Sequence, residues 1–212
     1  SMFDDFCDKV QNIDLYEQIN KIKMHSAQRD AVKTAINNGV SIVTGGPGTG
    51  KTTIANRLKQ KYGMKELPSY TTRPKRKEDE EGHTFVSLGE FMLLKNKVAA
   101  NKYRGNFYCA TKEQVEEYDT YVCDCEGIKM LKETYKGDKN IIVVRLTCPR
   151  EERKRRMEKD NRPPQEILLR DSKDPVEFQY ADMLADYMLD NDNLEETVDA
   201  VRYIYEKECE ED

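Results

Sequence analysis

A glycine-rich segment carries the clearest chemistry in the chain. Residues 45–52 read Gly-Gly-Pro-Gly-Thr-Gly-Lys-Thr and match the pattern G-x-x-x-x-G-K-[ST]. In such a loop, backbone N–H groups surround phosphate oxygens, the lysine reaches the outer phosphates and the hydroxyl can ligate Mg²⁺. We therefore predict a nucleoside triphosphate site. The predicted phosphate-binding residues are Gly45, Gly48, Thr49, Gly50, Lys51, Thr52 and Thr53, with Thr52 as the metal ligand.

A second feature that can bind phosphate is basic. Arg73 and Arg76 flank a turn stiffened by Pro74 and can hold a monophosphate dianion through charge-assisted, bidentate hydrogen bonds. The phenol of Tyr108 could donate to the same phosphate. The alternative interpretation is a solvated basic turn that the acidic residues 78–81 balance. Because a phosphate loop stands beside them in the sequence, we favour the monophosphate site.

The elements that must position these residues alternate along the chain. An apolar run at 40–44 precedes the phosphate loop, and Ile54, Leu58 and Tyr62 form a helical stripe after it. Such alternation indicates an α/β fold, a parallel sheet wrapped by helices. Further strands are expected at 120–125, 141–146 and 187–189, and further helices around 112–118 and 128–135, from about 150, and at 194–206.

The residues before the first strand predict a separate extension. Apolar residues between Phe3 and Ile19 recur at spacings of three or four, which is typical of amphipathic helices. Residues 26–32 together with the phosphate loop also look like the start of a DNA helicase motor, in which a glutamine reads adenine. The chain after Thr53 is too short for such a motor. We keep only the hypothesis that Gln28 contacts the adenine of ATP.

Five segments resemble those of guanylate kinases in their order and spacing. They are residues 69–76, 82–87, 105–108, 123–127 and 190–194. The resemblance covers most of the chain from Val40 onward. It implies a P-loop NTPase three-layer fold with a five-stranded parallel sheet, a small monophosphate-binding subdomain and a helical lid. The expected parts are an N-terminal helical extension at 1–38 and a kinase-like domain at 39–212, with its core at 39–68 and 119–208, the subdomain at 69–118 and the lid at about 150–172.

The resemblance also assigns an acceptor site. In the family, two arginines and a tyrosine grip the acceptor phosphate, and a serine and an aspartate contact the purine base. A histidine stands here where the family has a phosphate-binding tyrosine, and it can still donate to phosphate in a pH-dependent way. The monophosphate-binding residues implied are Ser69, Arg73, Arg76, His83, Tyr108 and Asp124.

Three further positions depart from the family pattern. Ala99 stands where a glutamate reads the guanine edge, and Ala110 replaces a small hydroxyl residue. Val122 occupies the place of a second acid, so Asp124 could instead belong to the water shell of Mg²⁺. Because buried polar contacts let a pocket reject the wrong base, the Ala99 departure leaves the identity of the base open.

The densest positive region follows the predicted strand at 141–146. By resemblance, residues 150–156 begin the lid that closes over the phosphates. Arginines at the positions of Arg156 and Arg170 would neutralise charge on the transferring group, and closure would exclude water. With Lys51, these two arginines are the predicted catalytic residues.

Composition excludes several other classes of protein. The formal net charge is −5, from 35 basic and 40 acidic residues in 212, so a nucleic-acid interface is disfavoured. No apolar run approaches the ~20 residues needed to cross a bilayer, and the amino terminus lacks the pattern of a secretion signal. The six cysteines and two histidines show no zinc-ligand spacing. We expect a cytoplasmic protein, as a monomer or homodimer.

These features predict an ATP-dependent nucleoside monophosphate kinase of guanylate kinase type. Mg²⁺ would accompany ATP, and the acceptor would be GMP, dGMP or a related monophosphate. One alternative is a non-catalytic guanylate kinase-like module that binds phosphorylated or acidic peptides through Arg73, Arg76 and Tyr108. The intact Lys51 and Thr52 favour the enzyme. Another alternative is a family kinase with a non-guanine phosphorylated acceptor.

Overall fold

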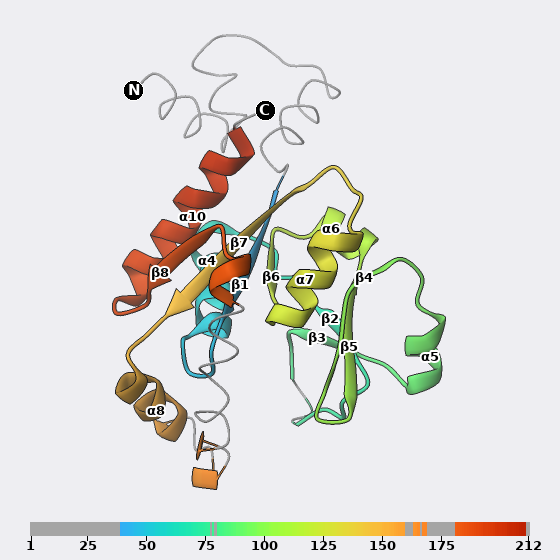
Figure 1. Cartoon of the computed structure of the whole chain (residues 1–212), viewed down its shortest axis with the longest axis horizontal. Coiled ribbons are helices and arrows are strands. Elements are labelled where there is room, and N and C mark those ends of the chain that lie inside the picture. Colours follow the sequence, from blue (N-terminus) through green and yellow to red (C-terminus); the bar gives the residue numbers. More distant parts are fainter. Residues whose placement is uncertain are drawn as a thin grey trace.

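A computed structural model describes residues 39–76, 78, 80–159, 163–165, 167–168 and 181–210 (Figure 1). The predicted extension at 1–38, with Gln28, lies outside the described residues, as does Arg170. Among the helices that are described, none combines the length and apolar composition needed to cross a membrane.

A parallel sheet forms the centre of the fold. Its strands are β1 (Gly39–Gly45), β6 (Thr120–Val122), β7 (Asn140–Thr147) and β8 (Tyr187–Asp190). They are hydrogen-bonded in the order β6-β1-β7-β8, and every pair is parallel. The first six residues of β1 are buried, because a strand inside a parallel sheet is covered on both faces. The carboxyl ends of β1 and β6 therefore lie next to each other at one edge of the sheet.

Within the part of the chain that the structure describes, the sheet has four strands, so the prediction of five was wrong. The place beside β6 is taken by a single bridge between Glu66 and Thr120, where the Leu67 N–H donates to the Thr120 carbonyl at 2.8 Å. The next residue, Pro68, has no N–H with which to continue a ladder. Ser69 already belongs to a second sheet. The chain thus leaves the central sheet before a fifth strand forms.

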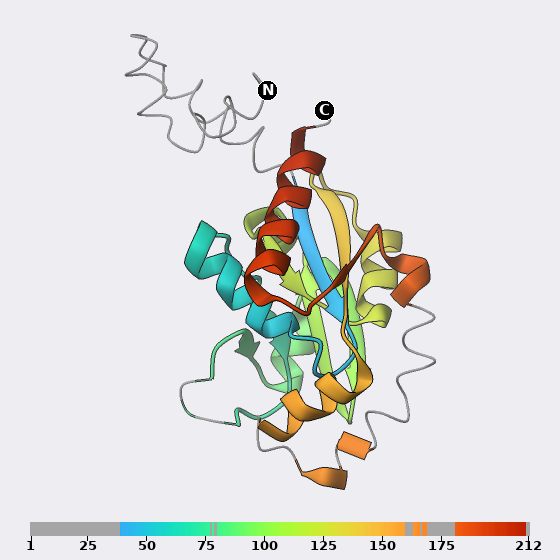
Figure 2. The same cartoon turned by 90° about the vertical axis from the view of Figure 1, so that its left-hand side faces the viewer.

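Helices cover one face of this sheet, and a helix together with a second sheet covers the other (Figures 1 and 2). In the described part of the chain, the named helices are α4 (Lys51–Tyr62), α5 (Leu88–Leu93), α6 (Lys112–Glu117), α7 (Cys125–Thr134), α8 (Arg150–Lys159) and α10 (Leu194–Glu210). Ile54 of α4 and Val201 of α10 share a core with Val144 of β7. On the opposite face, Ile128 of α7 packs in the cluster that holds Ile42 of β1.

The second sheet is smaller and mixed. Its strands are β2 (Ser69–Thr71), β3 (His83–Phe85), β4 (Lys97–Tyr103) and β5 (Asn106–Thr111), in the order β3-β2-β5-β4. A tight turn joins β4 to β5, with Arg104 and Gly105 both at positive φ, as a two-residue hairpin requires. Ala99 and Ala110 of this sheet belong to the same buried cluster as Ile42. One continuous core therefore fixes the second sheet against the first.

Candidate functional site

The loop after β1 has the backbone geometry of a phosphate cradle. Gly45, Gly48 and Gly50 all have positive φ, which only glycine adopts freely. Gly50 is the N-cap of α4 and has no side chain to accept a hydrogen bond from the first turn of the helix. A Cβ at Gly50 would collide with Nδ2 of Asn191, and the positive φ would strain any other residue there. The N–H groups at the start of α4 can therefore serve an external anion.

The predicted phosphate-binding side chains gather at this loop. The Lys51 Nζ donates to the carbonyl oxygens of Gly45 and Gly46 at 2.7 and 3.0 Å. The Thr49 hydroxyl is buried and donates to the Gly46 carbonyl at 2.8 Å. Thr52 and Thr53 are exposed in the first turn of α4. This arrangement leaves the Thr52 hydroxyl accessible to a ligand.

Helix α8, with which the predicted lid begins, packs directly on the loop. A Cβ at Gly48 would lie 2.7 Å from the Arg153 carbonyl oxygen. The Nη2 of Arg156 donates to the Asn191 carbonyl at 2.8 Å, and the Asn191 Nδ2 donates to the Thr49 carbonyl at 2.8 Å. Glu152 accepts from the Arg156 Nε at 2.8 Å. The predicted catalytic Arg156 is thus held beside the phosphate loop.

Asn191 is a site residue to which we gave no role from the sequence. It is 3% exposed and links the loop to α8 through its side chain and its backbone carbonyl. The sequence signal was its place in the recurring segment 190–194. An amide side chain by itself indicates no particular chemistry, so only the contacts reveal its position.

A cavity of about 190 Å³ lies between the two sheets. Four of the predicted monophosphate-binding residues line it, namely Ser69, His83, Tyr108 and Asp124. Ala99, Asn101 and Tyr103 of β4 line it as well. Asp124 follows β6, the neighbour of β1, and the positive charge of Lys51 acts on its carboxyl group. The cavity therefore adjoins the phosphate loop.

His83 lies in the wall of the cavity that β2 and β3 form. Its Nδ1 lies 2.9 Å from the Ser69 Oγ, and its ring meets the Tyr108 ring edge-on with centroids 5.9 Å apart. Burial, followed by repulsion from the Arg73 guanidinium, lowers the pKa of His83 below its ordinary value. Both effects favour the neutral form of the imidazole.

The two predicted phosphate-gripping arginines lie at the rim and do not line the cavity. The Arg73 guanidinium donates to both carboxylate oxygens of Glu80 at 2.8 and 3.2 Å, and the backbone N–H of Arg76 donates to the same carboxylate at 2.7 Å. Tyr108 also contributes to raising the pKa of Arg73, after the larger effect of Glu80. Arg73 thus reaches the residues of the cavity, whereas Arg76 is exposed.

We expect the Glu80 contact to make folding stability depend on pH. The Arg73 hydrogen bonds lower the pKa of Glu80 from 4.5 to about 2. Because the folded pKa is depressed, this stabilisation is complete above about pH 4.5 and is lost progressively as the pH falls towards about 2. Urea unfolding of wild type and Glu80→Gln across this range should give a difference in unfolding free energy that shrinks on acidification. Glu81→Gln, at an exposed neighbour, serves as the control. A Glu80→Gln difference that is independent of pH would contradict the assignment.

Asp124 caps α7 and faces the cavity. Its Oδ1 accepts from the Gly127 N–H at 2.9 Å, and its Oδ2 accepts from the Asn101 amide. Asp124 is exposed, yet the protein around its carboxylate partly desolvates it, and this desolvation raises its pKa more than the Gly127 hydrogen bond lowers it. Ala99 is 2% exposed at the same wall, and Val122 also lines the cavity. Asp124 is thus the one carboxylate among the described lining residues.

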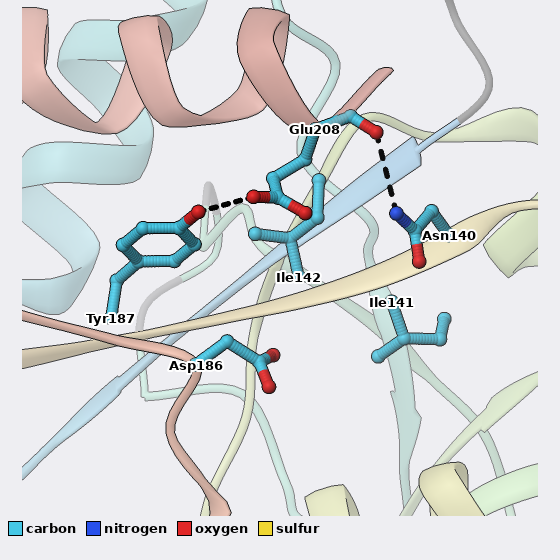
Figure 3. Close-up of a pocket in the computed structure, with 6 residues that line it drawn as sticks. All are labelled: Asn140, Ile141, Ile142, Asp186, Tyr187 and Glu208. Atoms are coloured by element: carbon cyan, nitrogen blue, oxygen red, sulfur yellow. Dashed lines mark hydrogen bonds between the residues drawn. The ribbon is translucent and has the colours of Figure 1, made fainter. Parts of the chain in front are cut away.

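A second cavity, of about 390 Å³, lies at the opposite edge of the central sheet, where β7 begins (Figure 3). Its polar groups bond to one another. The Tyr187 hydroxyl donates to the Glu208 carboxylate, and the Asn140 Nδ2 donates to the Glu208 carbonyl at 3.3 Å (Figure 3). Asp186 accepts from the Val143 N–H at 2.7 Å. These hydrogen bonds within the protein give no indication of a ligand.

The comparisons with known proteins agree with this arrangement. The sequence model of the family described as guanylate kinase matches residues 38–208, which is most of the chain. The chain belongs to the guanylate kinase family. The crystal structure of guanylate kinase from Anaplasma phagocytophilum superposes with a TM-score of 0.60 at 24% identity, over 81% of this chain and 87% of that chain. That likeness shows the guanylate kinase fold.

Two further comparisons add no argument about function. An uncharacterized protein from Eubacterium ventriosum matches with a TM-score of 0.43 at 11% identity, over 79% of this chain and 98% of that chain. No curated protein matches the chain. Membership of the guanylate kinase family therefore rests on the family match, and the fold on the first structure.

Proposed function

We propose that the chain is an ATP-dependent nucleoside monophosphate kinase that transfers the γ-phosphate of ATP to GMP, dGMP or a related monophosphate. The observation that carries this proposal is that the phosphate loop and the cavity between the sheets adjoin each other. The phosphate loop follows β1, and the cavity lined by Asp124 follows the neighbouring strand β6. A donor and an acceptor phosphate bound at these places would meet at one edge of the sheet.

The chemistry requires positioning and charge neutralisation more than a nucleophilic side chain. The acceptor phosphate is already an anion, so holding it in line with the donor supplies most of the catalysis. Lys51 at the loop and Arg156 of α8 would balance the charge of the transferring group. Arg73, Tyr108 and His83 would hold the acceptor phosphate.

Mg²⁺ fits this site as a partner of ATP. The part of the chain that the structure describes contains no group of three or more His, Cys, Asp or Glu side chains arranged to hold a metal ion. Mg²⁺ bound with a nucleotide needs few protein ligands, because phosphates and water fill most of its octahedron. The exposed Thr52 hydroxyl at the start of α4 would supply one ligand. The ion would neutralise phosphate charge when bound.

The experiment that tests the proposal is an assay of acceptor-dependent ADP release. The purified chain is supplied with ATP and Mg²⁺ and, separately, with GMP, dGMP, AMP, CMP, UMP or dTMP. We expect release with at least one purine monophosphate above the rate without acceptor. Equal rates with and without every acceptor would contradict a monophosphate kinase. Preference for a monophosphate other than GMP or dGMP would favour the alternative acceptor that Ala99 suggests.

A further inference from the structure

Asn101 carries a buried hydrogen-bond acceptor without a partner in the wall of the cavity between the sheets. Its Nδ2 donates to the Asp124 carboxylate, whereas its Oδ1 is buried and accepts no hydrogen bond. Several described side-chain oxygens are buried without a hydrogen-bond partner. Of these, only the Asn101 Oδ1 belongs to a residue that lines this cavity. A buried acceptor left in this state carries a desolvation cost, which a ligand with a matching donor would remove.

The second cavity shows the contrast. There the Tyr187 hydroxyl donates to the Glu208 carboxylate and the Asn140 Nδ2 donates to the Glu208 carbonyl (Figure 3), and no side-chain oxygen of the described lining residues is both buried and without a partner. The cavity beside Asn101 is half as large in volume, about 190 against 390 Å³, yet it holds the unsatisfied acceptor. The missing hydrogen bond therefore points to the smaller cavity as the place where a donor binds.

Strand β4 brings Asn101 to the same wall as Ala99. Residues two apart on a strand face the same side, so Ala99 and Asn101 both line the cavity. In the ladder with β5, Ala99 lies opposite Ala110 and Asn101 lies opposite Tyr108. The alanine pair makes the wall apolar at the position where the family has a glutamate. The next polar group along this face of β4 is the Asn101 amide.

Asn101 and Asp124 together offer two neighbouring acceptors. A carboxylate has about four acceptor positions, and Gly127 and Asn101 use two of those on Asp124. Because Oδ1 is shielded from solvent, accepting from a bound base requires the Asn101 amide to turn about its Cβ–Cγ bond and to give up its hydrogen bond to Asp124. Guanine presents two adjacent donors, N1–H and the amino group on C2. Adenine presents one donor beside an acceptor, which two protein acceptors do not match.

We infer that Asn101 is a specificity-determining residue in this chain: with Asp124, it accepts the two adjacent N–H groups of guanine and replaces the base contact that Ala99 cannot make. This inference rests on the proposed monophosphate kinase function. It assigns base selection to a residue of β4 that the sequence resemblance did not single out.

The test compares acceptors that share a phosphate and a ribose but differ in the base edge. The ratio of kcat/KM for GMP to that for AMP is measured for wild type, for Asn101→Ala and for the control Asn106→Ala. Asn106 lies on β5, where its Nδ2 donates to the Arg104 carbonyl at 3.3 Å. We expect Asn101→Ala to lower this ratio by about tenfold or more, because one acceptor for guanine is lost. The control should keep the wild-type ratio. IMP, which lacks the amino group on C2, should fall between GMP and AMP with wild type.

A merely structural role for Asn101 would lower both activities together and leave the ratio unchanged, and this result in a folded variant would overturn the inference. The fold of the variant is checked by its melting temperature. If wild type turns over no monophosphate, the proposed function fails, and calorimetric titration with GMP and AMP then decides the role of Asn101. Tighter GMP binding that Asn101→Ala abolishes would still support base reading, whereas equal affinity of wild type for GMP and AMP would refute it.

Discussion

Replacing Lys51 with alanine is expected to lower kcat by about a thousandfold with every accepted monophosphate. The Lys51 ammonium lies against the carbonyl oxygens of Gly45 and Gly46 at the start of α4, where the outer phosphates of ATP would bind. Its positive charge would balance the charge that spreads over the transferring group. Steady-state assays with saturating ATP and acceptor measure the effect.

A matched control lies on the same helix. Lys59 is an exposed residue of α4 near its carboxyl end, so Lys59→Ala should retain wild-type kcat. Because Lys51 also bonds to the loop, the melting temperature of Lys51→Ala must show that the protein remains folded. If folded Lys51→Ala protein had the kcat of wild type, the phosphate loop would have no part in the reaction.

The phosphate loop and the alternation around it could be predicted because they depend on local sequence. Glycines before Lys51 and a helical stripe after it define a strand, a loop and a helix without any distant contact. The buried strand β1 follows from its apolar run in the same way. The strand expected at 120–125 ends at Val122 instead, because Asp124 caps α7 through the Gly127 N–H. Aspartate is a preferred N-cap residue, and here the strand pattern concealed that helix-start signal.

The rest of the site depends on contacts between distant parts of the chain. Asn191 bonds to Thr49 across 142 residues, and Asn101 bonds to Asp124 across 23. Neither amide has a periodicity or charge that distinguishes it in the sequence. Glu80 is an intermediate case. In the sequence the acidic stretch indicates only a possible balance for the basic turn, whereas in the structure both carboxylate oxygens of Glu80 accept from Arg73.

The contact between Arg73 and Glu80 leads to the second prediction, on acceptor binding. We expect Arg73→Ala to raise the KM of the monophosphate by about tenfold to a hundredfold, because charge-assisted bidentate hydrogen bonds to phosphate are lost. The KM of ATP should stay within about twofold of wild type. Arg73→Lys should be nearly as impaired, since a lysine keeps the charge but cannot form two parallel hydrogen bonds. Lys95→Ala, at an exposed residue between α5 and β4, should have no effect.

Glu80 provides a second test of this prediction, because Arg73→Ala leaves the Glu80 carboxylate at the rim without its guanidinium partner. That carboxylate would repel an incoming phosphate, so part of the rise in KM comes from Glu80 and not from the lost arginine contact. The double variant Arg73→Ala/Glu80→Gln should therefore recover part of the acceptor affinity but not all of it. Full recovery would mean that Arg73 serves only to neutralise Glu80. An unchanged acceptor KM in Arg73→Ala would place the acceptor phosphate elsewhere in the molecule.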